Sequence, residues 1–282
     1  MKLKYFTSLI CMISILKTTA QSGYSLELNI KTVPTEMITK NETGVGFSFY
    51  DNWNTKNKIS NTISYKNTGL NFDLDDYYSS DTNYRLNRIE NNLELSHKFN
   101  KKISLDLELK TVAAFKNNFG ISNVSLFGGA EMHYSFNEKN SLQLGVRRMS
   151  VFGKAAVLPT LAFYSRLNPD TDIEIGFPNS AIHYSNNERN HFSLTNSFDG
   201  EYYKLEQNKK IESNLTTSRV GFSQMTTALE YERNVDKNWF LSFQGGYQFN
   251  KKHRLTDNRG TTKFNFDAND GTLFNIGIKY KQ

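Results

Sequence analysis

The most suggestive pair of reactive side chains in this 282-residue chain is His183 and Ser185. Side chains two positions apart on an extended strand point to the same side, so the imidazole of His183 could accept the proton of the Ser185 hydroxyl. A catalytic histidine also needs a third group to orient it, and the chain offers Asn196 and Ser197 downstream instead of a carboxylate. Acyl hydrolysis is therefore an alternative function, beside the simpler interpretation of an ordinary strand end that leads into a polar turn.

A second candidate site is a set of charged residues that share one face of alternating segments. These side chains could line a mixed-charge aqueous passage, but the interior of any membrane barrel is polar, so both interpretations stay open. The candidate lumen-lining residues are Glu27, Glu94, Asp106, Glu108, Lys110, Glu131, His133, Arg166, Glu174, Glu230 and Lys279.

Carboxylates also gather at Asp73, Asp75, Asp76 and Asp81. Oxygen ligands suit calcium, but this spacing matches no known cation-binding loop and favours a hydrated surface loop. The chain contains no glycine-rich phosphate loop, no zinc-ligand spacing and no basic-aromatic stripe. We therefore expect neither a cofactor nor a metal.

The elements that must position these residues are strands. In the segment 103–110, Ile103, Leu105, Leu107 and Leu109 alternate with polar residues, a two-residue period that a helix cannot produce. The same period recurs along the chain, although the pair Arg147-Arg148 interrupts it. One of the two arginines must therefore leave the inner face, unless the strand has already reached the surface or bulges there.

The two ends of the predicted sheet fit each other. Residues 23–30 and 271–280 each alternate apolar and polar side chains, so each presents one apolar face. Pairing the first strand with the last closes a barrel and removes both free edges. We therefore predict an all-β, single closed antiparallel transmembrane barrel.

The turn lengths indicate how many strands the barrel has. One class of connection is uniformly short, at 51–57, 100–102, 137–140, 168–171, 186–190 and 234–237. The other class holds every long loop, including 207–217 and the longest, at 253–270, as in outer-membrane barrels. The count is about 14 strands, with 12 as the alternative.

Aromatic residues near the predicted strand ends support a membrane barrel over a secreted soluble sandwich, because amphipathic rings belong at the lipid headgroup level. These residues are Tyr24, Tyr65, Phe99, Tyr134, Phe136, Trp239, Phe249 and Tyr280.

The N-terminal segment has the features of a secretory signal peptide. Lys2 and Lys4 precede a short apolar run, and small residues lead to Ala20, so we expect 1–20 to be removed and 21–282 to form the barrel domain. The only cysteine, Cys11, lies in this leader, so disulfide chemistry is excluded from the mature chain. Loss of Lys2, Lys4 and Lys17 lowers the formal charge from +6 to +3, too little to argue for nucleic acid.

Residues 157–205 carry a family resemblance. Leu158-Pro159, Phe177-Pro178, Tyr184, and Gly200 followed by Tyr203 resemble a family of bacterial outer-membrane β-barrel proteins of unknown function. The resemblance implies a barrel fold and an outer-membrane location, but it supplies no activity and no functional residues. The order His-x-Ser-Asn at 183–186 also resembles outer-membrane acyl hydrolases, whose serine faces lipid.

From the sequence we predict an outer-membrane barrel that is a passive or narrowly selective channel or a structural surface protein, with an outer-membrane acyl hydrolase as the alternative. Its expected partners are outer-membrane lipid and the barrel-assembly machinery, with a small solute as a candidate ligand and without nucleic acid.

Overall fold

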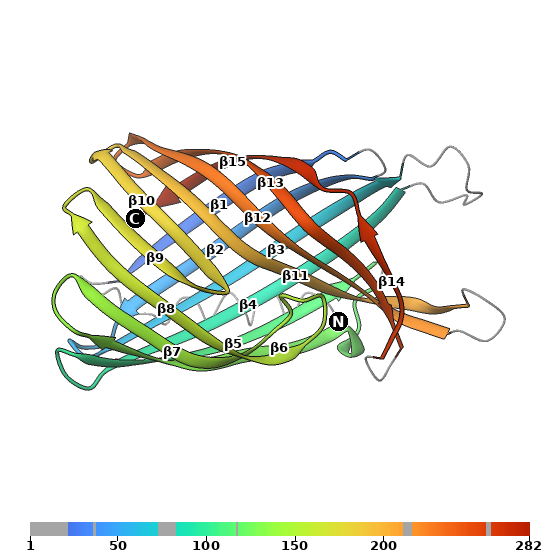
Figure 1. Cartoon of the computed structure of the whole chain (residues 1–282), viewed down its shortest axis with the longest axis horizontal. Helices are drawn as coiled ribbons and strands as arrows, with labels where there is room; N and C mark the ends of the chain where they lie inside the picture. Colours follow the sequence, from blue (N-terminus) through green and yellow to red (C-terminus); the bar gives the residue numbers. More distant parts are fainter. Residues whose placement is uncertain (1–21, 36–37, 73–82, 117, 211–215, 258–260) are drawn as a thin grey trace, which may run out of the picture.

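The protein is a single antiparallel β-barrel (Figure 1). The structure is a computed structural model that describes residues 22–35, 38–72, 83–116, 118–210, 216–257 and 261–282. Its strands are β1 (Gly23–Val33), β2 (Ile38–Asn52), β3 (Asn57–Phe72), β4 (Asn83–Lys98), β5 (Ile103–Phe115), β6 (Val124–Ser135), β7 (Asn140–Met149), β8 (Ala156–Asn168), β9 (Thr171–Phe177), β10 (Asn179–Asn187), β11 (Asn190–Lys210), β12 (Thr216–Asp236), β13 (Trp239–Thr256), β14 (Thr262–Ala268) and β15 (Gly271–Lys281). A 3-10 turn, η1 (Ile121–Asn123), precedes β6.

The barrel closes where the sequence predicts. β1 pairs with β15 along its length, with Leu28 opposite Ile278, and every other strand pairs with its chain neighbour. β14 and β15 continue one register along β13, because Ala268 lies opposite Lys251 and Gly271 lies opposite Gln248. These two segments are therefore one interrupted strand, and the wall has the predicted 14 strands.

The connections fall into two classes at opposite ends, which we call the turn end and the loop end. At the turn end, the side-chain oxygens of Asn54, Asn100, Asn137 and Asn187 each accept hydrogen bonds from two backbone N–H groups two and three residues later. Asparagine favours tight turns for this reason, so the predicted class of short turns is confirmed.

Two predicted loops are wrong at the loop end. The segment 253–270 is not the longest loop, because β13 continues to Thr256 and β14 returns from Thr262. The described parts of the predicted loop 207–217, at 207–210 and 216–217, are also strand, since β11 extends to Lys210 and β12 begins at Thr216. Both segments are too polar to show an apolar face, so their alternation does not reveal them. The loop at 73–82 lies outside the described residues.

The outer face of the wall is apolar and uncovered. Leu28 is 45 % exposed, Leu109 48 % and Ile276 54 %, and most other large outward side chains are similarly bare. Arg147 points inward to acidic residues and Arg148 is exposed on a continuous β7, so the prediction that one arginine leaves the inner face is confirmed without a bulge. Among the described residues, no helix is long and apolar enough to cross a membrane.

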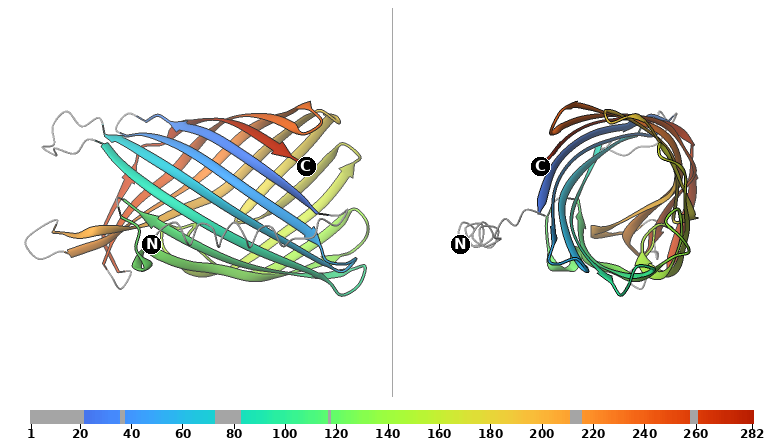
Figure 2. Two further views of the ribbon diagram at one scale, coloured as in Figure 1. Left: turned by 180° about the vertical axis from the view of Figure 1, so that it is seen from behind. Right: turned by 90° about the vertical axis from the view of Figure 1, so that its left-hand side faces the viewer.

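The wall is uneven in height. β9 and β10 have 7 and 9 residues, whereas β11 and β12 each have 21. The pairing of β10 with β11 ends at Ser197. The part of β11 beyond this residue does not pair with β10, and we call it the upper half of β11 (198–210). This upper half approaches β5 without pairing with it. In the end-on view of Figure 2, tan and orange ribbon lies inside the outline of the ring.

Candidate functional site

The inner face of β5, β6 and β7 carries a network of charged side chains. Arg147 pairs with Glu108 and lies 3.7 Å from Glu131, and the ammonium group of Lys110 lies 3.7 Å from Glu108. This arrangement joins four of the charges on three adjacent strands into one fixed cluster.

A second inner-face pair lies towards the turn end, where His133 Nε2 is 2.7 Å from Asp106 Oδ2. Both side chains are about one-third exposed, at 31 % and 37 %, so water reaches this pair.

The remaining charged candidates lie apart from these groups. Lys279 on β15 lies 3.1 Å from Glu232 and 4.0 Å from Glu27. Glu94 on β4 accepts a hydrogen bond from Ser60 at 3.2 Å, and Arg166 on β8 donates to the Tyr164 hydroxyl at 3.5 Å. Glu174 on β9 lies opposite Ala181 and Glu230 on β12 lies opposite Ser193. Whether these residues line a route for a solute stays a prediction.

The strongest inner-face cluster was missed by sequence reasoning. Glu201 on the upper half of β11 pairs with Lys66 on β3 and lies 3.5 Å from Lys40 on β2. Glu42 lies 2.9 Å from Lys40 and 3.4 Å from Lys66, and its side chain is only 7 % exposed. β11 is not adjacent to β2 or β3 in the sheet, so these ion pairs cross the lumen.

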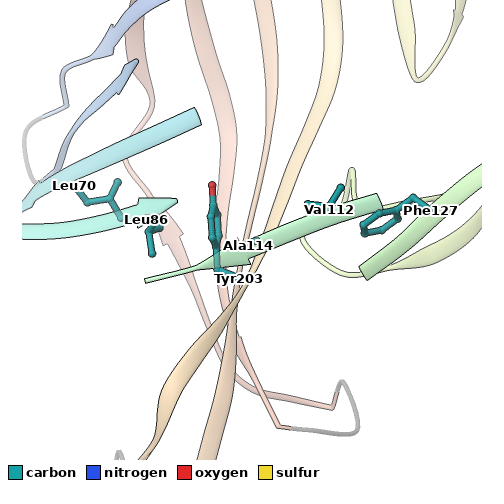
Figure 3. Packing of buried hydrophobic residues seen from close by; sticks show 6 residues of the cluster. All are labelled: Leu70, Leu86, Val112, Ala114, Phe127 and Tyr203. Atoms are coloured by element: carbon teal, nitrogen blue, oxygen red, sulfur yellow. The ribbon is translucent and has the colours of Figure 1, made fainter. Parts of the chain in front are cut away.

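An apolar cluster lies beside these ion pairs, inside the barrel (Figure 3). Tyr203 on β11 is fully buried and donates a hydrogen bond to Glu201 at 2.9 Å. It shares this cluster with residues of β3, β4, β5 and β6, and the cluster consists of Leu70, Leu86, Val112, Ala114, Phe127 and Tyr203. The upper half of β11 therefore fills part of the lumen at the loop end, and we call this region the β11 plug (Glu201 and Tyr203 with their partners).

The structure gives no hydrogen bond between His183 and Ser185, because each of the two residues has a partner on the neighbouring strand. His183 Nδ1 lies 2.8 Å from Ser193 Oγ, and Ser185 Oγ lies 2.8 Å from His191 Nδ1. The register of β10 against β11 sets each histidine opposite a serine. A signal was present in the sequence, since His-x-Ser occurs on both sides of the turn at 188–189, and antiparallel pairing crosses the two copies.

The sequence indicates the β11 plug less clearly than it indicates the two His-x-Ser pairs. Glu201 and Tyr203 continue the inward alternation of β11, but their partners depend on how far β11 leans into the lumen, which no local pattern encodes. Within the described ranges, no group of three or more His, Cys, Asp or Glu residues is placed to hold a metal ion. Asp73, Asp75, Asp76 and Asp81 lie outside these ranges.

Comparison with known proteins shows the fold. A Pseudomonas aeruginosa FadL homologue superposes with a TM-score of 0.50 at 10 % identity, covering 93 % of this chain and 90 % of that one. The translocator domain of the autotransporter NalP from Neisseria meningitidis gives 0.41 at 8 % identity, covering 99 % and 95 %. The KdgM porin in complex with disordered oligogalacturonate gives 0.39 at 9 % identity, covering 90 % and 98 %. No curated protein matches the sequence.

One family model spans nearly the whole chain. It matches residues 16–281 and is described as a domain of unknown function, DUF6268. The match includes the region 157–205 on which the resemblance to a barrel family of unknown function rests. The chain belongs to the DUF6268 family.

Proposed function

We propose that the protein is an outer-membrane channel that is narrowly selective for small polar solutes. The observation that carries this proposal is the β11 plug, which joins β11 to β2, β3 and β5 across a lumen whose wall is charged. An unobstructed barrel of this size would be a wider pore, whereas ion pairs and an apolar cluster inside it leave a narrow passage.

The outer surface supports the membrane location. Leu26, Leu161 and Phe243 are each between 47 and 49 % exposed, and such side chains are found around the whole wall. A water-soluble protein rarely leaves so large an apolar surface bare, whereas lipid covers it in a membrane barrel. Short turns lie on the periplasmic side of such barrels, so the proposal sets the β11 plug near the cell exterior. The proposal includes removal of residues 1–20 as a signal peptide and insertion by the barrel-assembly machinery.

Conductance measurements test the channel. Purified, refolded protein is added to planar lipid bilayers, and discrete current steps smaller than those of an open porin are expected. Protein that inserts and resists protease in liposomes, yet gives no current steps with any salt, would refute the channel and leave a structural surface role.

An acyl hydrolase is a second candidate, favoured by the hydrogen bond of 2.8 Å between Ser185 and His191. This geometry allows the imidazole to accept the serine proton. The serine points into the lumen and not to lipid, because it lies on the same face as His183, opposite to the exposed Ile182 and Tyr184. The test is ester cleavage in lipid micelles, with Ser185→Ala and His191→Gln as variants and Ser193→Ala as the matched control. Cleavage lost only in the first two variants would establish the hydrolase, and no cleavage by the wild type would exclude it.

A further inference from the structure

A buried arginine beside the plug is left with free hydrogen-bonding capacity. Arg88 on β4 is only 7 % exposed, and its Nε pairs with Glu90. Its Nη1 is buried and makes no hydrogen bond to any described residue. A guanidinium group has five N–H donors and no acceptor, and leaving a buried charged donor without a partner is costly. This atom therefore calls for an acceptor that the described part of the chain does not supply.

Arg88 lines a cavity of about 250 Å³ between the wall of β4 to β7 and β11. Lys110 and Arg147 line the same cavity from β5 and β7, and Phe127 forms an apolar side of it. Arg148 of β7 also lines it, so four basic groups from three different strands surround one small space.

The acidic residues of the cavity are already engaged. Glu108 is shared between Arg147 and Lys110. Asp199 accepts hydrogen bonds from Ser197 at 2.9 Å and from Thr226 at 2.7 Å. Neither carboxylate has a described contact with Arg88, so neither supplies the acceptor that Arg88 Nη1 lacks.

We propose that this cavity binds a small oxyanion, the carboxylate or phosphate group of a solute. A planar guanidinium matches two oxygens of such a group, and an ammonium group supplies a further charge-assisted hydrogen bond. The cavity lies where β11 leans towards β5, so an anion held there would sit at the narrowing of the lumen. Selection of anionic solutes by this site rests on the proposed channel, but binding itself does not.

Direct titration tests the site. Refolded protein in detergent at low ionic strength is titrated by calorimetry with sodium phosphate, sodium acetate and uncharged glycerol. We expect saturable binding of phosphate, acetate or both, and none of glycerol. Arg88→Gln should weaken the binding about tenfold or more, because it removes a charged donor. Arg166→Gln, on β8 and outside the residues that line the cavity, should change the affinity less than about twofold.

The two anions distinguish the solute class, since stronger phosphate binding indicates a phosphoryl group and stronger acetate binding a carboxylate. Lys110→Gln should also weaken the binding. It serves as the test variant if Arg88→Gln does not fold. Equal heats for anions and glycerol, or full affinity in Lys110→Gln and Arg88→Gln, would overturn the site. Binding that persists in a protein without current steps would refute the channel and retain the site.

Discussion

The replacement Glu201→Gln tests whether the β11 plug narrows the lumen. The amide keeps the shape of the carboxylate, and its oxygen can still accept the hydrogen bond that the Tyr203 hydroxyl donates to Glu201 at 2.9 Å. It loses the charge that faces Lys40 and Lys66, and among the described residues both lysines then keep one carboxylate partner, Glu42, at 2.9 and 3.4 Å. The substitution therefore weakens the hold of β2 and β3 on β11 without removing the side chain.

The magnitude follows from the exposure of the partners. Breaking a fully buried ion pair costs about 3–5 kcal/mol. The side chains here are 15 % exposed for Glu201 and Lys40 and 30 % for Lys66, so some water screens the charges. The charge-assisted value of about 1.5–3 kcal/mol is therefore the better guide. A free-energy change of 1.4 kcal/mol is a factor of ten in an equilibrium constant. The population of molecules in which the β11 plug has moved out of the lumen, the open population, should therefore rise about 10- to 150-fold.

Single-channel recording in planar bilayers measures this population. We expect Glu201→Gln to show a higher open probability or a larger conductance step than the wild type. Glu94→Gln is the matched control, since Glu94 lies on the inner face and accepts a hydrogen bond from Ser60. Adding Lys66→Gln to Glu201→Gln should give less than the sum of the two single effects, because the two residues share one ion pair. Unchanged recordings for a correctly inserted Glu201→Gln protein would refute the plug.

Three further changes probe the apolar cluster, the outer face and the loop end. Tyr203→Ala should enlarge the conductance step, because losing a fully buried ring costs about 3–5 kcal/mol of packing in the plug; bilayer recordings equal to the wild type would contradict this. Leu107→Arg on the lipid face should lower the free energy of unfolding from liposomes in urea by about 2–4 kcal/mol if this residue lies near the bilayer midplane, whereas Ser104→Arg on the inner face of the same strand should cost less than 1 kcal/mol. Gly221→Ala should destabilise the loop end by about 1–3 kcal/mol, because a Cβ there meets the carbonyl oxygen of Gly153; faster protease cleavage at 150–155 is the measurement, and unchanged cleavage would show that the loop yields freely.

The closure of the barrel could be predicted because it depends on local alternation. Leu105, Leu107 and Leu109 reveal their face without any knowledge of neighbouring strands. The pairing of 23–30 with 271–280 then follows from the need to leave no free edge. Inner-face charges such as Glu108 and Arg147 could be placed on the lumen side in the same way, although their pairing with each other could not.

The plug and the crossed His–Ser pairs could not be found in this way. The contact of Ser185 with His191 depends on the exact register across the turn at 188–189, and a shift of one residue would send one of the two side chains to the other face. The contact of Glu201 with Lys66 joins residues 135 positions apart on strands that are not neighbours. Such contacts are set by the path of the whole wall, so residue spacing along the chain carries no trace of them.

The short hairpin of β9 and β10 accounts for the path of β11. Proline cannot donate to a ladder, and Pro178 alone connects the two strands. The pairing of β9 with β8 therefore ends with Phe177 opposite Leu161, and that of β10 with β11 ends with Asn179 opposite Ser197. The upper half of β11 is therefore left with an edge that no strand of the β9–β10 hairpin covers, and the backbone N–H and C=O groups of such an edge need other partners.

The connection between β7 and β8 lies against the outer side of the upper half of β11 and supplies a hydrogen-bond partner there. Ser150 donates to the carbonyl of Gly200 at 2.9 Å, and Arg254 on β13 donates to the carbonyl of Phe152 at 2.6 Å. Gly200 and Gly221 have no side chain where the backbone of 150–153 lies against them, so this close approach is possible. With its outer face covered by this connection, β11 can lean inward, where Tyr203 and Glu201 find their partners. Strand number alone therefore overstates the width of this lumen, because the hairpin that stops early both opens a gap in the wall and directs the neighbouring strand into the passage.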